Sequence, residues 1–264
     1  MHFIGIDTGA ITTDGVLIDE DCNVIAELVR NTGSDMSAAA LAARDGLLQA
    51  APAGKAPVAA TVATGYGREN SAFADRAVSE IICHARGARH LFRECSLVID
   101  IGGQDTKVIA LGPDGLPVDF AMNDKCAAGT GRFLEVMATA LNVPLEQMGR
   151  RSLESAGGVR LGGTCTVFGE SEVISLISKG VAVNDILAAI HRSVAERVAG
   201  MMHSLHVTTH LKHGNVVVTG GVARNKGVVS ALEEILGTGV LVSDSPQTVG
   251  ALGAALIARK ERGE

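Results

Sequence analysis

One supersecondary unit occurs twice in this chain, and the repeat constrains the fold more than any other feature. The first copy reads FIGIDTG, TTDGVLIDE, the turn DCN and VIAELVRN; the second reads SLVIDIGGQDTKVIAL, the turn GPDG and LPVDFAMND. Each copy is an apolar strand that ends in an Asp-x-Gly turn, followed by two strands typical of an antiparallel pair. Asp7 and Asp100 occupy equivalent places. The duplication predicts two similar α/β lobes that face each other.

The remaining segments have helical character. Residues 34–50 are rich in alanine behind a Ser-Asp cap, and residues 74–92 are amphipathic. Further helices are expected near residues 127–141, 144–156, 168–180 and 183–206, and the small residues of 248–260 suit a helix that crosses close to another backbone. We expect a first lobe of residues 1–96 with the C-terminal helix 246–264, and a second lobe of residues 97–245.

Composition and charge exclude several classes of protein. The net charge is −6, tryptophan is absent and Tyr66 is the single tyrosine, whereas a nucleic-acid binder needs a basic face and rings for stacking. No apolar run approaches the ~18 residues of a membrane helix, and the N-terminus lacks the features of an export signal. We therefore expect a cytoplasmic α/β enzyme with neither a nucleic-acid nor a membrane partner.

Glycine follows three apolar strands, in IDTGA (6–10), IDIGGQD (99–105) and VTGGVARN (218–225). Glycine at the end of a strand lets backbone N–H groups approach phosphate oxygens. Asp7 and Asp100, at two of these turns, are suited to a hydrated Mg²⁺ ion, which needs only one or two carboxylates. One such turn is weak evidence, because a tight turn needs glycine anyway. Three in this order, two of them in a duplicated unit, indicate a nucleotide site.

With these motifs the chain resembles the superfamily of actin, sugar kinases and heat-shock chaperone ATPases. Segments 4–19, 98–111 and 216–228 are similar to its two phosphate motifs and its adenosine motif, and the helices near 76–92 and 248–260 to its interlobe connecting helices. The resemblance implies a duplicated ribonuclease-H-like, two-lobe fold with ATP or ADP and Mg²⁺ in a cleft between the lobes. It implies Asp7 and Asp100 as the carboxylates on the magnesium side. The residues expected at the nucleotide are Thr8, Gly9, Ala10, Thr12, Thr13, Gly102, Gly103, Asp105, Gly129, Gly131, Gly220, Gly221 and Asn225.

Gln104 follows Gly103 in the second turn, and two roles remain open for it. It could orient the attacking water, as glutamine does in other nucleotide hydrolases, or form a hydrogen bond that stabilises the turn.

The first phosphate loop departs from the pattern of the superfamily, which is Asp-x-Gly-Ser-Thr-x-x-Lys. Here Ala10 replaces the hydroxyl residue and Asp14 replaces the lysine. Loss of a cation near the phosphates is expected to weaken nucleotide binding or to slow turnover. The hydroxyls of Thr12 and Thr13 are candidate replacement donors.

Two cysteines carry a sharper signal. Cys126 lies in NDKCAAGTGRFLEVM and Cys165 in GGTCTVFGESEVISL, and each precedes an expected helix within a run of small residues. Helix N-termini favour negative charge and hence a thiolate. The alternative is that both are ordinary buried cysteines, the commonest state of a free thiol. Cys22, Cys83 and Cys95 lack this context, and we expect structural roles for all three.

Together with ATGYGR and AIHRSVAERV, these stretches resemble the ATP-dependent activators of 2-hydroxyacyl-CoA dehydratases, whose relatives include the ATPase subunits of benzoyl-CoA reductase. The resemblance covers nearly the whole chain. It implies that Cys126 and Cys165 of each subunit hold one 4Fe-4S cluster shared across a homodimer. It also implies ATP-driven transfer of one low-potential electron to a partner dehydratase or reductase, with a ferredoxin or flavodoxin as donor. The basic stretch ARGARH (85–90) is expected to be a solvated helix face or a docking surface for that donor.

Two other readings remain open from the sequence. The first is a sugar or N-acetylhexosamine-type kinase of the same superfamily that has no cluster. The second is a non-catalytic nucleotide-binding regulator, which the altered first phosphate loop favours.

Overall fold

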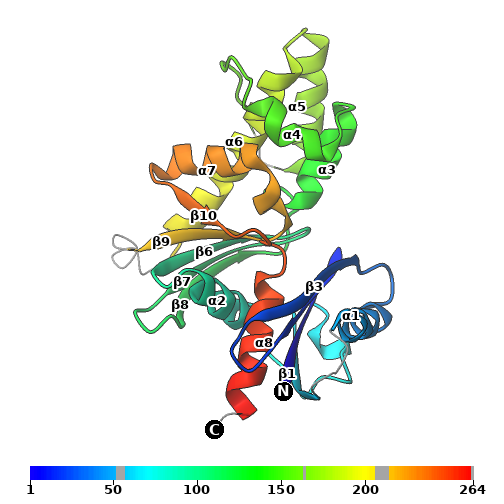
Figure 1. The fold of residues 1–264 in the computed structure, drawn as a ribbon. Helices are drawn as coiled ribbons and strands as arrows, with labels where there is room; N and C mark the ends of the chain where they lie inside the picture. Colours follow the sequence, from blue (N-terminus) through cyan, green and yellow to red (C-terminus); the bar gives the residue numbers. More distant parts are fainter. Residues whose placement is uncertain (52–56, 163–164, 206–213, 263–264) are drawn as a thin grey trace.

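The computed structural model describes residues 1–51, 57–162, 165–205 and 214–262, and these build two mixed sheets with helices around them (Figure 1). In the first sheet the order is β3-β2-β1-β4-β5, and in the second it is β10-β9-β6-β7-β8. The first sheet contains β1 (His2–Thr8), β2 (Thr12–Ile18), β3 (Val24–Asn31), β4 (Val58–Thr64) and β5 (Arg76–Ala77). The second contains β6 (Cys95–Ile101), β7 (Thr106–Leu111), β8 (Pro117–Asn123), β9 (Asn215–Thr219) and β10 (Val240–Val242).

The topology confirms the predicted duplication. In each sheet the first strand pairs antiparallel with the second, the second pairs antiparallel with the third, and the fourth lies parallel to the first. The register places Asp7 opposite Asp14 and Asp100 opposite Lys107. The turns close alike: the Gly9 N–H donates to the Thr12 carbonyl at 2.9 Å, and the equivalent bond in the second copy measures 3.0 Å. The α/β fold with two related halves is thus as expected.

Helices cover both sheets. Helix α1 (Met36–Ala50) packs on the first sheet, where Asp35 caps its N-terminus. Helices α3 (Gly131–Ala140), α4 (Leu145–Ser152), α5 (Thr166–Ser178), α6 (Val183–His203) and α7 (Lys226–Leu236) belong to the second half, and α5 lies far from the first sheet in Figure 1. In the described part of the chain, the short 3-10 helices η1 (Arg68–Asn70) and η3 (Gly221–Arg224) follow β4 and β9. None of the helices described is both long and apolar enough to cross a bilayer.

Two helices connect the halves. Helix α2 (Glu80–Leu91) packs against α8 (Val249–Arg262) and against strands of the second sheet, whereas α8 packs against β1, β2 and β4. A Cβ at Gly253 would overlap the Cys83 carbonyl, and one at Gly87 would overlap the Val249 carbonyl. The small residues of 248–260 therefore do allow two backbones to meet closely, as predicted. The division into lobes of 1–96 with 246–264 and of 97–245 stays a prediction.

Helix α2 begins at Glu80, six residues after the expected start at residue 74, and α4 ends at Ser152, four residues before the expected end. A third difference bears on the candidate site. Helix α3 begins at Gly131, four residues after the expected start at residue 127. Residues 127–130 form a turn instead, in which the Thr130 N–H donates to the Ala127 carbonyl at 3.0 Å. Gly129 has a φ of +89°, a left-handed conformation that an α-helix does not contain. Cys126 therefore precedes a turn and not the helix itself.

Candidate active site where the two sheets meet

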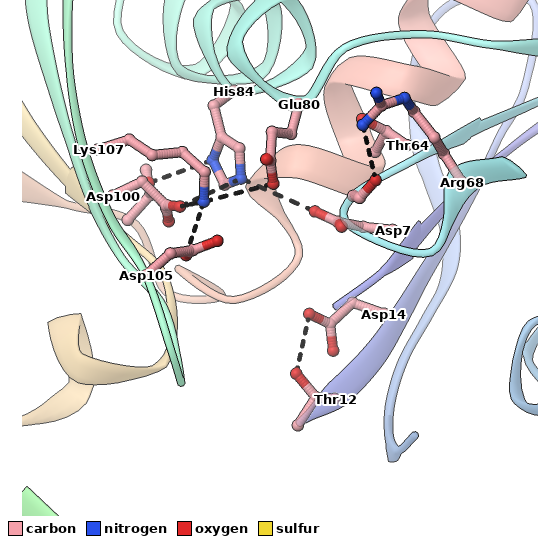
Figure 2. Close-up of polar contacts among 12 residues, drawn as sticks. Asp7, Thr12, Asp14, Thr64, Arg68, Glu80, His84, Asp100, Asp105 and Lys107 are labelled. Carbon is pink, nitrogen blue, oxygen red and sulfur yellow. Dashed lines mark hydrogen bonds and ion pairs between the residues drawn. The ribbon is translucent and has the colours of Figure 1, made fainter. Parts of the chain in front are cut away.

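A buried ion network joins the two copies of the repeated unit (Figure 2). Asp7 lies near the end of β1 and Asp100 near the end of β6, and both are buried. His84 of α2 lies between them, with its Nε2 atom 3.7 Å from Asp7 Oδ2 and 3.6 Å from Asp100 Oδ2. Thr219, at the end of β9, donates to Asp100 Oδ1 at 3.1 Å. The structure therefore brings the two predicted magnesium-side carboxylates to one site.

Lys107 is the cation of this network. Its Nζ atom lies 3.2 Å from Asp100 Oδ2, 2.7 Å from Asp105 Oδ1 and 3.3 Å from Glu80 Oε2, and the side chain is only 3% exposed. Burial acts to lower the pKa of Lys107, but the three carboxylates outweigh it and raise the pKa. Burial likewise acts to raise the pKa of Asp100, yet His84 and Lys107 hold it below its usual value. Lys107 and Asp100 are therefore charged together.

The first copy has the opposite charge at the matching position. Asp14 occupies the place that Lys107 occupies in the second copy, opposite Asp7. Burial raises the pKa of Asp7 well above its usual value, and the neighbouring carboxylates, foremost Asp14, raise it further. Burial also raises the pKa of Asp14 to about 7. Among the described residues, Asp14 Oδ1 has no hydrogen-bond partner. This excess of buried negative charge fits a cation that lies on the Asp7 side of the site.

The raised pKa of Asp14 predicts a pH-dependent stability. An unfolded aspartate loses its proton near pH ~3.9, whereas Asp14 keeps its proton in the folded state up to about pH 7. Folded protein thus binds the extra proton between these values, so stability falls as pH rises through this window, by roughly 4 kcal/mol at most. Asp14→Asn should flatten this decline in urea unfolding measured without divalent cations. The exposed Asp21→Asn should keep the parent profile, and an equal slope in parent and Asp14→Asn would contradict the assignment.

The first and second Gly-containing turns touch each other, and buried hydrogen bonds hold the first of them in place. A Cβ at Gly103 would overlap the Ile11 side chain, so the turns pack without space for one. Thr13 is fully buried, and its hydroxyl shares a 2.9 Å hydrogen bond with Thr32, which donates to the Gly9 carbonyl at 2.8 Å. Thr13 thus supports the loop from the core. Thr12 donates to Asp14 at 3.4 Å. Thr8 is buried, and its hydroxyl lacks a partner among the described residues.

The second turn is attached to the segment that carries Cys126. The N–H of Gly131 donates to the Gly102 carbonyl at 2.9 Å, and the N–H of Arg132 donates to the Gly103 carbonyl at 2.8 Å. Thr106 donates through its hydroxyl to the Gly129 carbonyl at 2.8 Å. The start of α3 and the loop before it are therefore bonded directly to the second turn.

The third turn lies against the same carboxylates. Gly220 has a φ of +84°, and a Cβ there would crowd the Ile101 carbonyl and Asp100 Oδ1. Gly221 begins η3 and is open to solvent. Asn225 caps α7 by accepting from the N–H of Gly227 at 3.0 Å, so its side-chain oxygen already has a structural partner.

Gln104 is exposed at the tip of the second turn. Within the described part of the chain, its side chain makes no hydrogen bond that would stabilise the turn. Its predicted role toward the attacking water stays a prediction.

The two candidate cluster ligands lie in the segments that lead into two packed helices. Cys165 is the N-cap residue of α5, Cys126 precedes the turn before α3, and both are half-buried free thiols. Helix α3 packs against α5 where Gly169 faces Phe133. Asn123 holds the loop by donating to the Cys126 carbonyl at 2.8 Å. Among the described residues, no group of three or more His, Cys, Asp or Glu side chains could hold a metal ion.

Two of the other three cysteines differ from this pair in burial. Cys83 and Cys95 are fully buried, and burial raises the pKa of each thiol to about 12. Cys22 lies in the turn between β2 and β3 with a φ of 65°. Cys83 and Cys95 thus have the surroundings of structural thiols, whereas Cys22 is half-buried like Cys126 and Cys165, and its structural role stays a prediction.

Sequence reasoning missed His84, Lys107, Glu80 and Thr219. Lys107 had a signal, because it stands in the second repeat where Asp14 stands in the first. Glu80 and His84 are four positions apart in the sequence and so share one face of α2. Thr219 is the residue just before Gly220, in a glycine turn that the sequence did identify.

Nearly the whole chain is similar to one family of ATPases. A model of the BadF/BadG/BcrA/BcrD ATPase family matches residues 4–258. The activator of lactoyl-CoA dehydratase from Anaerotignum propionicum is 44% identical over 98% of this chain and 97% of its own. Component A of (R)-2-hydroxyglutaryl-CoA dehydratase from Acidaminococcus fermentans has a TM-score of 0.93 at 43% identity, with both chains fully covered. The activator of 2-hydroxyisocaproyl-CoA dehydratase from Clostridium difficile, solved with bound ADPNP, has a TM-score of 0.90 at 42% identity over 100% and 96% of the chains.

Proposed function

The chain belongs to the BadF/BadG/BcrA/BcrD ATPase family, and we propose that this ATPase activates a partner 2-hydroxyacyl-CoA dehydratase or related reductase. In the proposed reaction it hydrolyses ATP and passes one low-potential electron to the partner. Its relatives at 41–44% identity are named as activators of three such dehydratases. A benzoyl-CoA reductase subunit from Thauera aromatica is 32% identical over 81% of this chain.

For hydrolysis, we propose that Asp7 and Asp100 face a hydrated Mg²⁺ ion bound to ATP. The raised pKa of Asp7 supports this, because a bound cation would compensate its charge. Lys107 keeps Asp100 ionised and Thr219 fixes its orientation. The Gly-containing turns offer N–H groups to the phosphates, Gly220 and Gly221 pass beneath the adenosine, and Gln104 orients the attacking water.

For electron transfer, we propose that Cys126 and Cys165 from each of two chains hold one 4Fe-4S cluster. When bound, such a cluster supplies a one-electron redox couple. Both thiols are half-buried, Cys165 at the N-cap of α5 and Cys126 in the loop that leads into α3, and such thiols are suitable ligands. Beside Cys165, Val167 and Phe168 of α5 are each 70% exposed, and Ile174 and Ile177 of the same helix are exposed too. An exposed apolar helix face next to the ligand supports contact with a second copy of the chain.

The observation that carries this proposal is the direct link between the nucleotide site and Cys126. Gly102 and Gly103 of the second phosphate turn accept hydrogen bonds from the first residues of α3, and Thr106 next to that turn bonds to Gly129. A displacement of the turn on hydrolysis therefore moves the loop that holds Cys126. ATP shifts this arrangement only through different affinities for the two positions of the loop.

The proposal is tested by stopped-flow oxidation of the reduced protein by a 2-hydroxyacyl-CoA dehydratase. Oxidation is expected to be fast with ATP and at least ~10-fold slower without it, and equal rates would contradict the proposal. Thr106→Val removes the bond to Gly129 and should reduce the effect of ATP on the rate, with Thr139→Val on the exposed face of α3 as the matched control.

A ferredoxin or flavodoxin is the proposed electron donor.

A further inference from the structure

A basic cavity lies between the C-terminal ends of the two connecting helices, away from the nucleotide site. Its volume is about 390 Å³, within the size range of small-molecule pockets. Helices α2 and α8, which pack side by side, supply most of its cationic residues (Figure 1), and Arg93 follows the end of α2. These residues are Arg86, Arg89, His90, Arg93, Arg259 and Lys260.

Part of this charge has a structural role. Arg89 donates to the carbonyls of Cys95 and Pro113 at 3.0 Å each, and Arg259 donates to the Glu20 carbonyl. Cations also stabilise the C-terminal end of a helix through its dipole. These effects account for Arg89 and Arg259.

Among the described residues, Arg86, Arg93 and Lys260 make no hydrogen bond of the kind that Arg89 and Arg259 make. Arg86, Arg93 and Lys260 are exposed, and they form no ion pair with any carboxylate in the described residues. None of the described residues that line the cavity is acidic, although the whole chain carries a net charge of −6. Burial and the positive charges of Arg86 and Arg93 lower the pKa of His90. Glu20 partly offsets the charge of Arg259, and among the described residues the Arg86 and Arg93 side of the cavity keeps a positive potential.

We propose that this cavity binds a small polyanion with two adjacent phosphoryl groups, such as the diphosphate part of a nucleotide or coenzyme. Arginine matches phosphate oxygens in bidentate geometry. Several cations from two helices suit a ligand with more charge and length than a single phosphate. The proposal stands independently of the cluster and of the dehydratase.

An acidic electron-donor protein is the other class of ligand that a basic surface attracts. Figure 1 places the C-terminal end of α8 at the opposite end of the molecule from α5, whose N-cap residue is Cys165. A donor bound at the cavity would lie far from the proposed cluster ligands, so a small anion is favoured.

The test is isothermal titration of the full-length protein with inorganic pyrophosphate, in buffer without divalent cations, so that the proposed Mg²⁺-dependent nucleotide site does not hold the pyrophosphate. We expect one pyrophosphate site per chain. The double variant Arg86→Ser/Arg93→Ser should lose at least ~10-fold in affinity, because each arginine supplies charge-assisted hydrogen bonds. The matched control Arg150→Ser/Lys179→Ser removes two exposed cations elsewhere and should change affinity less than ~2-fold.

Three results would overturn the proposal. The first is absence of pyrophosphate binding to the parent, or equal affinities in the two double variants. The second is orthophosphate binding as tightly as pyrophosphate, which would exclude the diphosphate class. The third is unchanged pyrophosphate binding in Arg86→Ser/Arg93→Ser together with loss of ferredoxin-driven reduction, which would assign the surface to a donor protein. Equal urea midpoints for both double variants and the parent are the control for folding.

Discussion

Replacing Lys107 by methionine is expected to lower the free energy of unfolding at pH 8 by about 3–5 kcal/mol. The buried ammonium group lies within 3.3 Å of carboxylate oxygens from Asp100, Asp105 and Glu80. Methionine preserves the length of the side chain but leaves buried negative charges without a counterion. Lys107 helps to lower the pKa of Asp100 in the folded protein. The stability that results is therefore present at pH values above the pKa of an unfolded aspartate and is lost in acid. The deficit of the variant should therefore shrink as pH falls below ~4.

Urea unfolding of Lys107→Met at pH 8 and at low pH measures both expectations. Lys179→Met at an exposed site is the matched control and should change stability by less than ~0.5 kcal/mol. A Lys107→Met variant as stable as this control at pH 8 would show that the network does not stabilise the fold.

Replacing Asp7 by asparagine is expected to change activity and stability in opposite directions. The raised pKa of Asp7 means that ionising this carboxylate destabilises the nucleotide-free fold at pH 8. Asparagine cannot ionise, so the variant should be more stable than the parent without metal and nucleotide. Loss of the charge that faces the metal should cost several kcal/mol in the transition state. This corresponds to a decrease in kcat for ATP hydrolysis of at least ~100-fold.

A lower kcat together with a higher stability distinguishes a residue selected for catalysis from a residue that only supports the fold. Steady-state phosphate release and urea unfolding on the same preparation give both values, with the exposed Asp21→Asn as control. A destabilised Asp7→Asn variant that keeps parental kcat would remove Asp7 from the proposed site.

The sequence predicted the duplicated strands and the facing aspartates because those features are local. An apolar strand, an Asp-x-Gly turn and a strand pair are written in contiguous residues, and the sheets reproduce them with Asp7 and Asp100 in equivalent register. The close packing of α8 was also predictable, because a run of small residues such as the one around Gly253 lets another backbone approach the helix closely.

The remaining parts of the site depend on tertiary packing. His84 reaches Asp7 and Asp100 only because α2 packs near both sheets. Thr13, which was expected at the nucleotide, is fully buried and shares a hydrogen bond with Thr32, a contact between β2 and the residue after β3. The delayed start of α3 follows from the left-handed Gly129, which a helical periodicity does not reveal. Local patterns thus defined the strands and turns, whereas the partners of the charged groups required the assembled fold.

The most direct test concerns the sulfur ligands of Cys126 and Cys165. The protein is reconstituted with iron and sulfide under anaerobic conditions, and its mass and its iron content per chain are measured together. A 4Fe-4S cluster shared between two chains predicts a dimer with about two iron atoms per chain. The iron should be lost in Cys126→Ser and in Cys165→Ser but kept in Cys22→Ser. A monomer without iron, or equal iron in all three variants, would contradict it.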